Sequence, residues 1–198
     1  RYDLELWNWL DDFYNDGIIG DNLEKINDIN YEAYNICYFN KTRERVNRKY
    51  MNHFKTSDAV YLEHIKKDED DKASGIYIYE NLPIMAIVNK LKASKKSDLK
   101  QALYCNSDTM RVVSFNKDII TMKLDIADEF GNDIVEVKYS DFHKSFVCNY
   151  CSTTHKNQGA TITQKIQLWD WSKMTEDRRI AYTAVSRGKT VQQIKIVV

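Results

Sequence analysis

Proline and glycine are scarce in this sequence, which has 1 proline and 6 glycines among 198 residues. Disordered segments are usually rich in these residues and poor in apolar ones, whereas 43% of this chain is apolar and 29% is charged. The composition therefore argues against disorder and indicates a globular protein. A chain of this length can form one domain, or a medium-sized domain with a small insertion.

The sequence also lacks a membrane anchor and a charge excess. It has neither a secretory signal pattern nor an apolar run of about 18 residues, the length that a spanning helix needs, which favours a soluble intracellular protein with no membrane contact. The net charge is zero, so any contact with nucleic acid must be local. Because no initiating methionine is present, we expect a fragment of a longer protein.

Closely spaced metal ligands are few. Cys148 and Cys151 form a C-x-x-C pair, whereas Cys37 and Cys105 are isolated in the sequence. A structural zinc site usually takes two such pairs, or one pair with nearby histidines. The apolar residues around the pair favour one buried strand, running from about Phe146 to Ser152, with reduced thiols. Zinc binding is the weaker alternative, and we expect no metal site.

The first part of the chain, residues 1–74, has the pattern of helices and one buried strand. Helical spacing of apolar residues predicts an amphipathic helix over 1–14, while the polar segment 22–30 predicts a turn of helix and a loop. The apolar run 35–40 resembles a buried parallel strand, and a basic helix is expected over 41–54. Together the last two elements predict a βα unit.

A mixed-charge segment, 66–74, marks a boundary, after which the pattern changes. Residues 75–146 carry short alternating strands with hairpin-like connections, and the segment 92–103 is rich in lysine. Such a set predicts a small β-barrel inserted into a larger domain. The expected strands are 76–79, 84–88, 111–115, 119–124 and 134–139.

Residues 147–198 return to the pattern of a parallel sheet. We expect a strand near 165–169, a helix over 176–186 with Thr175 as its N-cap, and a last strand over 193–198. The predicted fold class is therefore α/β, with a parallel sheet flanked by helices and a small inserted β-barrel.

Two strings in this last part resemble motifs of a known family. The string TTHKNQG, residues 153–159, resembles motif V of superfamily 1 helicases, and YTAVSR, residues 182–187, resembles motif VI. Their order and separation fit that family as well. The resemblance implies that residues 1–74 and 147–198 form a RecA-like domain.

The inserted region narrows the resemblance to the RecD- and Dda-like, 5′-to-3′ helicases. It contains LPIM at 82–85, Asn89 and YCN at 104–106, in a pattern similar to theirs, although Ser107 replaces their glycine. In that subgroup the insertion is an SH3-like barrel within the second RecA-like domain.

The resemblance also implies roles for single residues. Arg187 would be the catalytic arginine, which stabilises the charge that develops on the γ-phosphate of ATP. The residues that would bind nucleotide are Gln158, Gly159, Lys156 and Arg1. Those that would contact nucleic acid are Thr154, His155 and Asn40. Trp171 is a further candidate on separate grounds, because an aromatic ring can stack on an unpaired base.

Simpler interpretations of these residues stay open. Arg187 is also compatible with a surface position at a helix end, and His155 with a structural role. Alternation in the string 167–171 favours a core position for Trp169, while Trp171 could belong to the core or stack on an unpaired base.

The phosphate-binding loop G-x-x-x-x-G-K-S/T is absent from the sequence. In this family ATP binds between two RecA-like domains, so the resemblance implies an N-terminal RecA-like partner domain that supplies the loop and the Mg²⁺ ligands. The expected function is the C-terminal motor part of an ATP-dependent DNA helicase of a cell or virus, acting in replication or repair. It would translocate on single-stranded DNA and be inactive alone.

Two alternatives to this function remain. One is a non-catalytic module that binds single-stranded nucleic acid or a protein. The other is an RNA helicase of the viral superfamily 1 type, because motifs V and VI are similar in those proteins.

Overall fold

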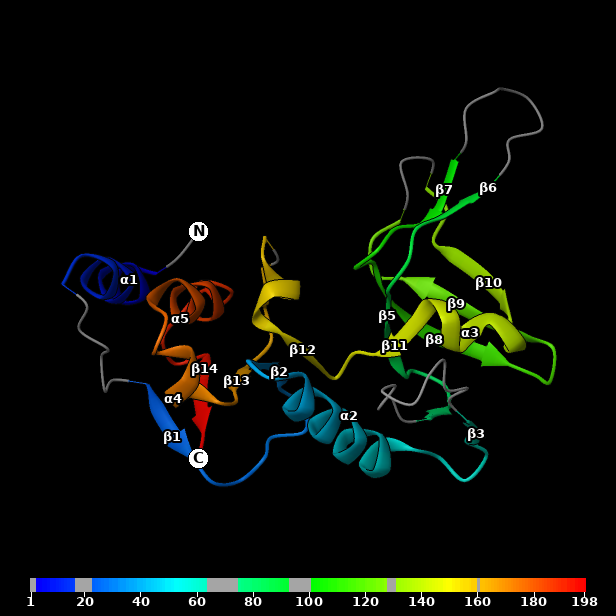
Figure 1. Ribbon diagram of the computed structural model, residues 1–198, viewed down its shortest axis with the longest axis horizontal. Helices are drawn as coiled ribbons and strands as arrows, with labels where there is room; N and C mark the ends of the chain where they lie inside the picture. The colour runs from blue at the N-terminus through cyan, green and yellow to red at the C-terminus, as the bar shows by residue number, and fades with distance from the viewer. Residues whose placement is uncertain (1–2, 17–22, 64–74, 93–100, 128–130, 160) are drawn as a thin grey trace. The chain divides into compact units, whose positions relative to one another are not determined.

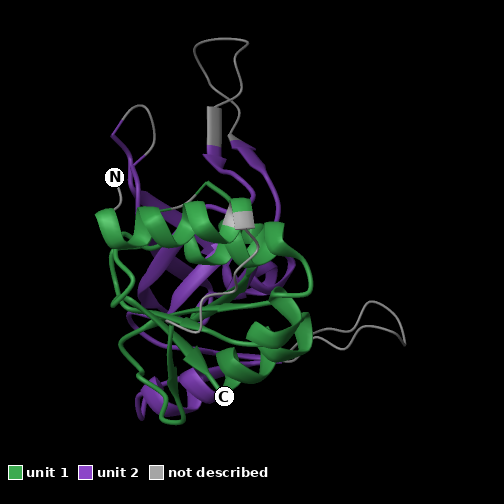
Figure 2. Cartoon of the chain, turned by 90° about the vertical axis from the view of Figure 1, so that its left-hand side faces the viewer, with its two compact units in different colours: residues 1–48, 150–198 green, residues 49–149 purple. Residues whose placement is uncertain are grey.

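A computed structural model describes residues 3–16, 23–63, 75–92, 101–127, 131–159 and 161–198 (Figure 1). The chain divides into two compact units, one made of residues 1–48 and 150–198 and the other of residues 49–149 (Figure 2). The chain thus leaves the first unit, builds the second, and returns to complete the first.

The first unit is built on a five-stranded sheet in which all neighbouring strands are parallel. This confirms the predicted parallel sheet. The strands, in spatial order, are β1 (Glu24–Ile26), β14 (Ile194–Val197), β13 (Ile166–Leu168), β2 (Tyr34–Cys37) and β12 (Cys151–Thr153).

Strand β1 corrects the sequence analysis, which expected a turn of helix and a loop over 22–30. It lies at the edge of the sheet, and two of its three residues are exposed. Because a strand in that position buries almost no apolar side chain, the sequence carries no hydrophobic signal for it.

Three helices bury apolar side chains in the core of the first unit: α1 (Leu4–Asp16), α4 (Trp171–Met174) and α5 (Arg178–Val185). The Asp3 carboxylate accepts a hydrogen bond from the Leu6 amide at 2.8 Å and so caps α1. From the sheet, Leu168 reaches this core in register with Ile36 and Ile196. The amphipathic first helix, predicted over 1–14, is confirmed over 4–16.

The residues that alternate with Ile36 and Leu168 along β2 and β13 form a buried amide network in the middle of the sheet. Asn35 and Gln167 are registered with each other and are 0% and 1% exposed. The Asn35 Oδ1 atom accepts hydrogen bonds from Gln167 Nε2 at 2.9 Å and Trp169 Nε1 at 2.8 Å, while its Nδ2 donates to the Tyr150 carbonyl at 3.0 Å. One side chain therefore ties β2 to β13 and to the segment that enters β12.

The basic helix α2 (Asn40–Phe54) attaches to the edge strand β12 through Asn47. This side chain donates to the Cys151 carbonyl at 3.1 Å and accepts from the Cys151 amide at 2.8 Å. It thus satisfies backbone groups of an edge strand, which would otherwise lack a partner on that side. The predicted βα unit is confirmed, with the strand ending at Cys37.

The second unit contains a five-stranded antiparallel sheet and two short hairpins, which confirms the expected short strands. Both ends of the lysine-rich segment 92–103 lie in strands, and residues 93–100 lie outside the described part. The SH3-like barrel stays a prediction. The sheet consists, in spatial order, of β10 (Ile134–Lys138), β9 (Ile119–Leu124), β8 (Thr109–Phe115), β5 (Pro83–Ala86) and β11 (Phe146–Cys148). The hairpins are β3 (Val60–Leu62) with β4 (Ile76–Ile78), and β6 (Lys90–Lys92) with β7 (Gln101–Tyr104). The short helix α3 (Phe142–Ser145) follows the 3₁₀ turn η1 (Tyr139–Asp141).

Ser107 has a backbone conformation that favours glycine. Its φ is 78°, in the left-handed region, which costs a side-chain-bearing residue more than glycine. The preceding residue, Asn106, donates a hydrogen bond from its amide to the Oδ1 atom of Asn89 at 2.6 Å. The position where serine replaces the expected glycine therefore has glycine-like geometry.

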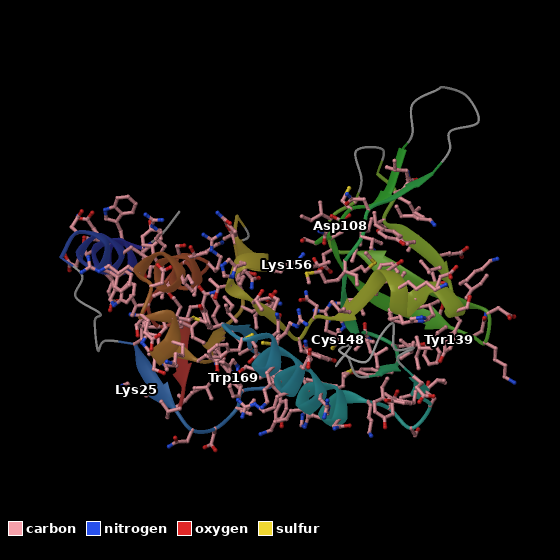
Figure 3. All side chains as sticks on the ribbon, viewed as in Figure 1. Lys25, Asp108, Tyr139, Cys148, Lys156 and Trp169 are labelled. Atoms are coloured by element: carbon pink, nitrogen blue, oxygen red, sulfur yellow. The ribbon has the colours of Figure 1, made fainter. Side chains whose placement is uncertain are left out.

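The C-x-x-C pair lies on two strands, not on the single strand that we expected from Phe146 to Ser152. Cys148 (labelled in Figure 3) ends β11 in the antiparallel sheet, whereas Cys151 begins β12 in the parallel sheet. The chain passes from one unit to the other at Asn149 and Tyr150. Only Asn149 and Tyr150 separate the two strands, so the sequence pattern gives no sign of this change of sheet.

Two details near α5 also differ from expectation. Its N-cap is Asp177, whose carboxylate accepts from the Arg179 amide at 2.9 Å, while the Thr175 hydroxyl donates to the Ser172 carbonyl at 3.0 Å. The alternation in residues 167–171 is not a strand throughout, because β13 ends at Leu168 and α4 begins at Trp171. Among the described helices, none is both long and apolar enough to cross a membrane.

Replacing Asn35 with alanine should destabilise the protein by about 3 kcal/mol, because the Trp169 and Gln167 donors and the Tyr150 carbonyl lose a buried partner. Urea unfolding followed by far-UV circular dichroism measures this change. The matched control is Asn52→Ala, since Asn52 is exposed on α2, and it should stay within about 0.5 kcal/mol of the parent. A loss below about 1 kcal/mol for Asn35→Ala would show that the network does not stabilise the sheet.

Candidate nucleotide and nucleic-acid site

The motif V string forms a tight turn at the carboxyl edge of the parallel sheet. The 3₁₀ segment η2 (Thr154–Asn157) directly follows β12, and Gly159 has a φ of 88°, a left-handed conformation that glycine adopts without strain. Lys156 is labelled on this turn in Figure 3. The predicted residues His155, Lys156, Gln158 and Gly159 are all exposed. The turn therefore presents a basic side chain, an imidazole and an amide to solvent.

Arg187 follows α5 and reaches the motif V turn. Its Nε donates to the Thr183 carbonyl at 2.8 Å, its Nη2 to Ser186 Oγ at 2.8 Å, and its Nη1 to the Asn157 carbonyl at 3.2 Å. The side chain is only half-buried. The structure thus brings the two motif strings together, with a fixed positive charge beside the turn.

Asn157 connects this arginine to the middle of the sheet. Its Nδ2 donates to Ser152 Oγ at 2.6 Å and to the Thr153 carbonyl at 3.1 Å, and its Oδ1 accepts from the Tyr34 hydroxyl at 2.9 Å. The Tyr34 and Ser152 hydroxyls lie 3.0 Å apart. A continuous set of hydrogen bonds therefore runs from β2 through η2 to Arg187.

The site includes three residues that the sequence did not single out: Tyr34, Ser152 and Asn157. Asn157 is inside the motif V string, and its position in a turn could have identified it as a polar residue with backbone partners. Tyr34 had no such signal, because its contact with Asn157 depends on β2 lying beside β12.

Thr154 is buried at 2% exposure, although we predicted a contact with nucleic acid. Its hydroxyl donates to the Cys37 carbonyl at 3.3 Å, and Met174 Sδ lies 3.8 Å away. The structure therefore gives this side chain a packing role between η2, β2 and α4, and the nucleic-acid contact stays a prediction.

Asn40 and Trp171 follow the neighbouring strands β2 and β13, so they lie at the same carboxyl edge as the motif V turn. Asn40 is exposed at the start of α2, whereas Trp171 is half-buried and packs against the core. Arg1 lies outside the described residues. The edge thus gathers most of the predicted residues, although Trp171 offers only part of its ring.

Asp170 holds the turn that precedes α2. It has a φ of 59°, and its carboxylate accepts hydrogen bonds from the amides of Tyr38 and Phe39, at 3.2 and 3.1 Å, and from the Thr42 hydroxyl at 2.9 Å. These hydrogen bonds tie the segment after β13 to the turn between β2 and α2, so Asp170 helps to fix where Asn40 lies.

Trp169 is a core residue, as its alternation with polar neighbours predicted. It is 8% exposed, and its Nε1 donates to Asn35 within the buried amide network. It is therefore not a platform for an unpaired base in this conformation.

The described part of the chain contains no group of three or more His, Cys, Asp or Glu side chains that could hold a metal ion. Cys37, Cys148 and Cys151 are buried, whereas Cys105 is exposed. Burial raises the pKa of the Cys151 thiol well above its usual value, and a hydrogen bond with Cys37 raises it further. The predicted buried thiols of the C-x-x-C pair are confirmed.

One cysteine should therefore react quickly with a thiol reagent in the native protein. At about pH 8, Ellman's reagent should label Cys105 fast and the three buried thiols only as the protein opens. Cys105→Ser should remove the fast phase, whereas the control Cys148→Ser should keep it. Fast labelling that survives Cys105→Ser would contradict the burial of the other three.

Comparison with known proteins gives structural relatives only. No family model and no curated protein matches the sequence. Bacteroides Pif1 bound to ssDNA aligns with a TM-score of 0.65 at 18% identity, over 97% of this chain and 48% of that one. A Pif1 helicase solved for DNA unwinding at forked dsDNA aligns with 0.64 at 17%, over 99% and 47%. Pif1 helicase from Candida albicans aligns with 0.60 at 13%, over 97% and 53%.

This chain therefore spans about half the length of each of these helicases. At such low identities, the likeness shows the fold. The sheet order, the flanking helices and the alignment over nearly the whole chain together show that the protein has the fold of a RecA-like helicase domain.

Proposed function

We propose that this chain is the C-terminal motor part of an ATP-dependent superfamily 1 helicase that translocates on single-stranded DNA. The observation that carries the proposal is the contact of Arg187 with the Asn157 carbonyl, which joins the motif VI arginine to the motif V turn. Both lie at the carboxyl edge of a parallel sheet, where open α/β sheets bind their ligands. A structural neighbour, Bacteroides Pif1, has been solved in complex with ADP-AlF3 and ssDNA.

Arg187 can supply positive charge to a transferring phosphoryl group. Its guanidinium is fixed by hydrogen bonds to Thr183 and Ser186, so the charge is oriented before a ligand arrives. The Nη1 contact with Asn157 is the longest of the three, at 3.2 Å. We propose that this contact gives way to a phosphate oxygen when the partner domain closes, which reports the state of the nucleotide to the motif V turn.

The residues present fit one wall of an ATP site. The Arg187 and Lys156 side chains can donate hydrogen bonds to phosphate oxygens, and Gln158 and Gly159 lie on the same turn as Lys156. Arg1 is included in the proposal on the basis of the family resemblance alone. The chain has no phosphate loop. We therefore propose that ATP and Mg²⁺ are held chiefly by an N-terminal RecA-like domain, which also supplies the Mg²⁺ ligands.

The strand contacts are proposed for the exposed residues of the same edge. His155 would meet the DNA backbone, Asn40 would contact it from the start of α2, and Thr154 would act mainly by holding η2 in place. Trp171 would offer the exposed part of its ring. The 5′-to-3′ direction, the SH3-like barrel and a domain division at residues 74 and 146 belong to the same proposal.

Replacing Arg187 with alanine should lower ATP turnover by about 1,000-fold in a protein that joins this chain to its partner domain. Binding of single-stranded DNA, measured by fluorescence anisotropy, should change little. Arg187→Lys should recover only part of the rate, because lysine keeps the charge and loses the planar fork.

Arg178→Ala is the matched control, since Arg178 is exposed at the opposite end of α5. It should leave turnover within about twofold of the parent, as expected for a surface residue. Normal hydrolysis by Arg187→Ala would exclude the catalytic role, and equal losses in both variants would indicate a folding defect instead.

The 198-residue chain should hydrolyse no ATP and unwind no duplex by itself, because the phosphate loop is absent from it. A coupled ATPase assay with and without single-stranded DNA measures this directly. DNA-stimulated turnover by the purified chain would contradict the proposal. Strand binding without turnover, even when the chain is joined to a RecA-like partner domain, would support a non-catalytic binding module. Stimulation by RNA alone would support an RNA helicase.

A further inference from the structure

Three basic residues form a stripe along the exposed side of α2. Lys41, Arg45 and Arg48, here called the α2 basic stripe, are spaced by four and three residues and therefore share one helix face. All three are exposed. At 1.5 Å per residue, the stripe extends about 10 Å along the helix axis.

The charges of the stripe are not neutralised by the described part of the chain. None of the three residues makes an ion pair there, and the one acidic residue of α2, Glu44, pairs with Arg43 at 3.7 Å. Lys41 also lies in the first turn of the helix, where the helix dipole disfavours positive charge. A protein of zero net charge thus lines up three cations on one helix face, one of them where it weakens the helix, and this points to an anionic partner.

Arg45 is held in place by an aromatic ring. Its guanidinium carbon lies 5.7 Å from the centroid of Trp169, which is itself fixed by the hydrogen bond to Asn35. Such a contact orders a side chain that would otherwise sample many rotamers. The middle charge of the stripe is therefore positioned before a partner binds.

The stripe begins beside the motif V turn. Strand β2 leads into α2, and its neighbour β12 leads into η2, so both begin at the same edge of the sheet. The Thr154 hydroxyl donates to the Cys37 carbonyl at 3.3 Å, which places the first residue of η2 against the end of β2. From this edge the stripe leads away along α2, so that it continues from the proposed strand site.

We propose that the α2 basic stripe binds the phosphates of the same DNA single strand beyond the motif V turn and so lengthens the footprint of the protein. The inference rests on the proposed function. The occupant is a single strand because the stripe continues a site proposed for one, and because lysine and arginine heads aligned along one helix face match a row of phosphates. The contact would carry no sequence preference and would weaken with salt.

The experiment compares two triple variants of the 198-residue chain by fluorescence anisotropy over a salt series. The stripe variant carries Lys41→Gln, Arg45→Gln and Arg48→Gln, which preserve helix propensity. The control variant removes the same charge from exposed lysines of the second unit, by Lys90→Gln, Lys117→Gln and Lys138→Gln. The probes are labelled oligo-dT strands of about 6 and about 20 nucleotides, which bracket common single-strand site sizes.

The stripe variant should bind the long strand more weakly, with a salt slope smaller by about 2, because each lost phosphate contact removes about 0.7. Its affinity for the short strand, and both affinities of the control variant, should change less than twofold, within the range of a surface substitution. An unchanged slope, an equal loss in the control variant, or an equal loss on both strands would overturn the inference.

Failure of the inference is distinguishable from failure of the proposed function. If the parent chain binds neither strand, or if His155→Ala leaves the binding of both strands unchanged, the proposed strand site itself fails. If His155→Ala weakens both strands while the stripe variant binds like the parent, the strand site stands and the inference is wrong. Tighter binding of poly-glutamate than of oligo-dT would assign the stripe to an acidic protein segment and would also overturn it.

Discussion

The hydrogen bonds of Asn35 are the constraint on which the first unit depends. This buried amide joins β2 to β13 through Gln167 and Trp169 and to the entry of β12 through the Tyr150 carbonyl. Three neighbouring strands are thereby held in one register. Because parallel strands end at the same edge, that register decides where the motif V turn, the start of α2 and Asp170 emerge. A buried amide with unmet partners is costly, so alternative registers are disfavoured.

The candidate site contains a second set of hydrogen bonds, separate from that of Asn35. Tyr34 contacts Asn157, and the Asn157 carbonyl accepts from Arg187, so the arginine is linked to the sheet through the motif V turn. Asp170 holds the turn before α2 in the same way. The exposed side chains of the edge therefore rest on a fixed support, which suits groups that must meet a phosphate or a strand in a defined geometry.

Much of the fold was predictable, because strong periodic patterns report burial. The first helix, the basic helix α2 and the short strands of the second unit all followed from apolar spacing. The edge strand β1 was missed because it buries little, and the C-x-x-C segment was assigned to one strand because only two residues separate β11 from β12. Hydrophobic pattern shows that a residue is buried; it does not show in which sheet.

By itself, the sequence determined the class of fold and the motif residues. The string 153–159 contains residues that favour a turn, including a glycine that can adopt a left-handed φ, and the string 182–187 has the apolar spacing of a helix. Only the tertiary structure decided which of those residues face solvent. Thr154 is buried while His155 and Lys156 are exposed, and Arg187 meets Asn157 across 30 positions of sequence. The physical reason is that exposure and contact depend on how neighbouring strands are paired, and strand pairing is a property of the whole sheet rather than of any local segment.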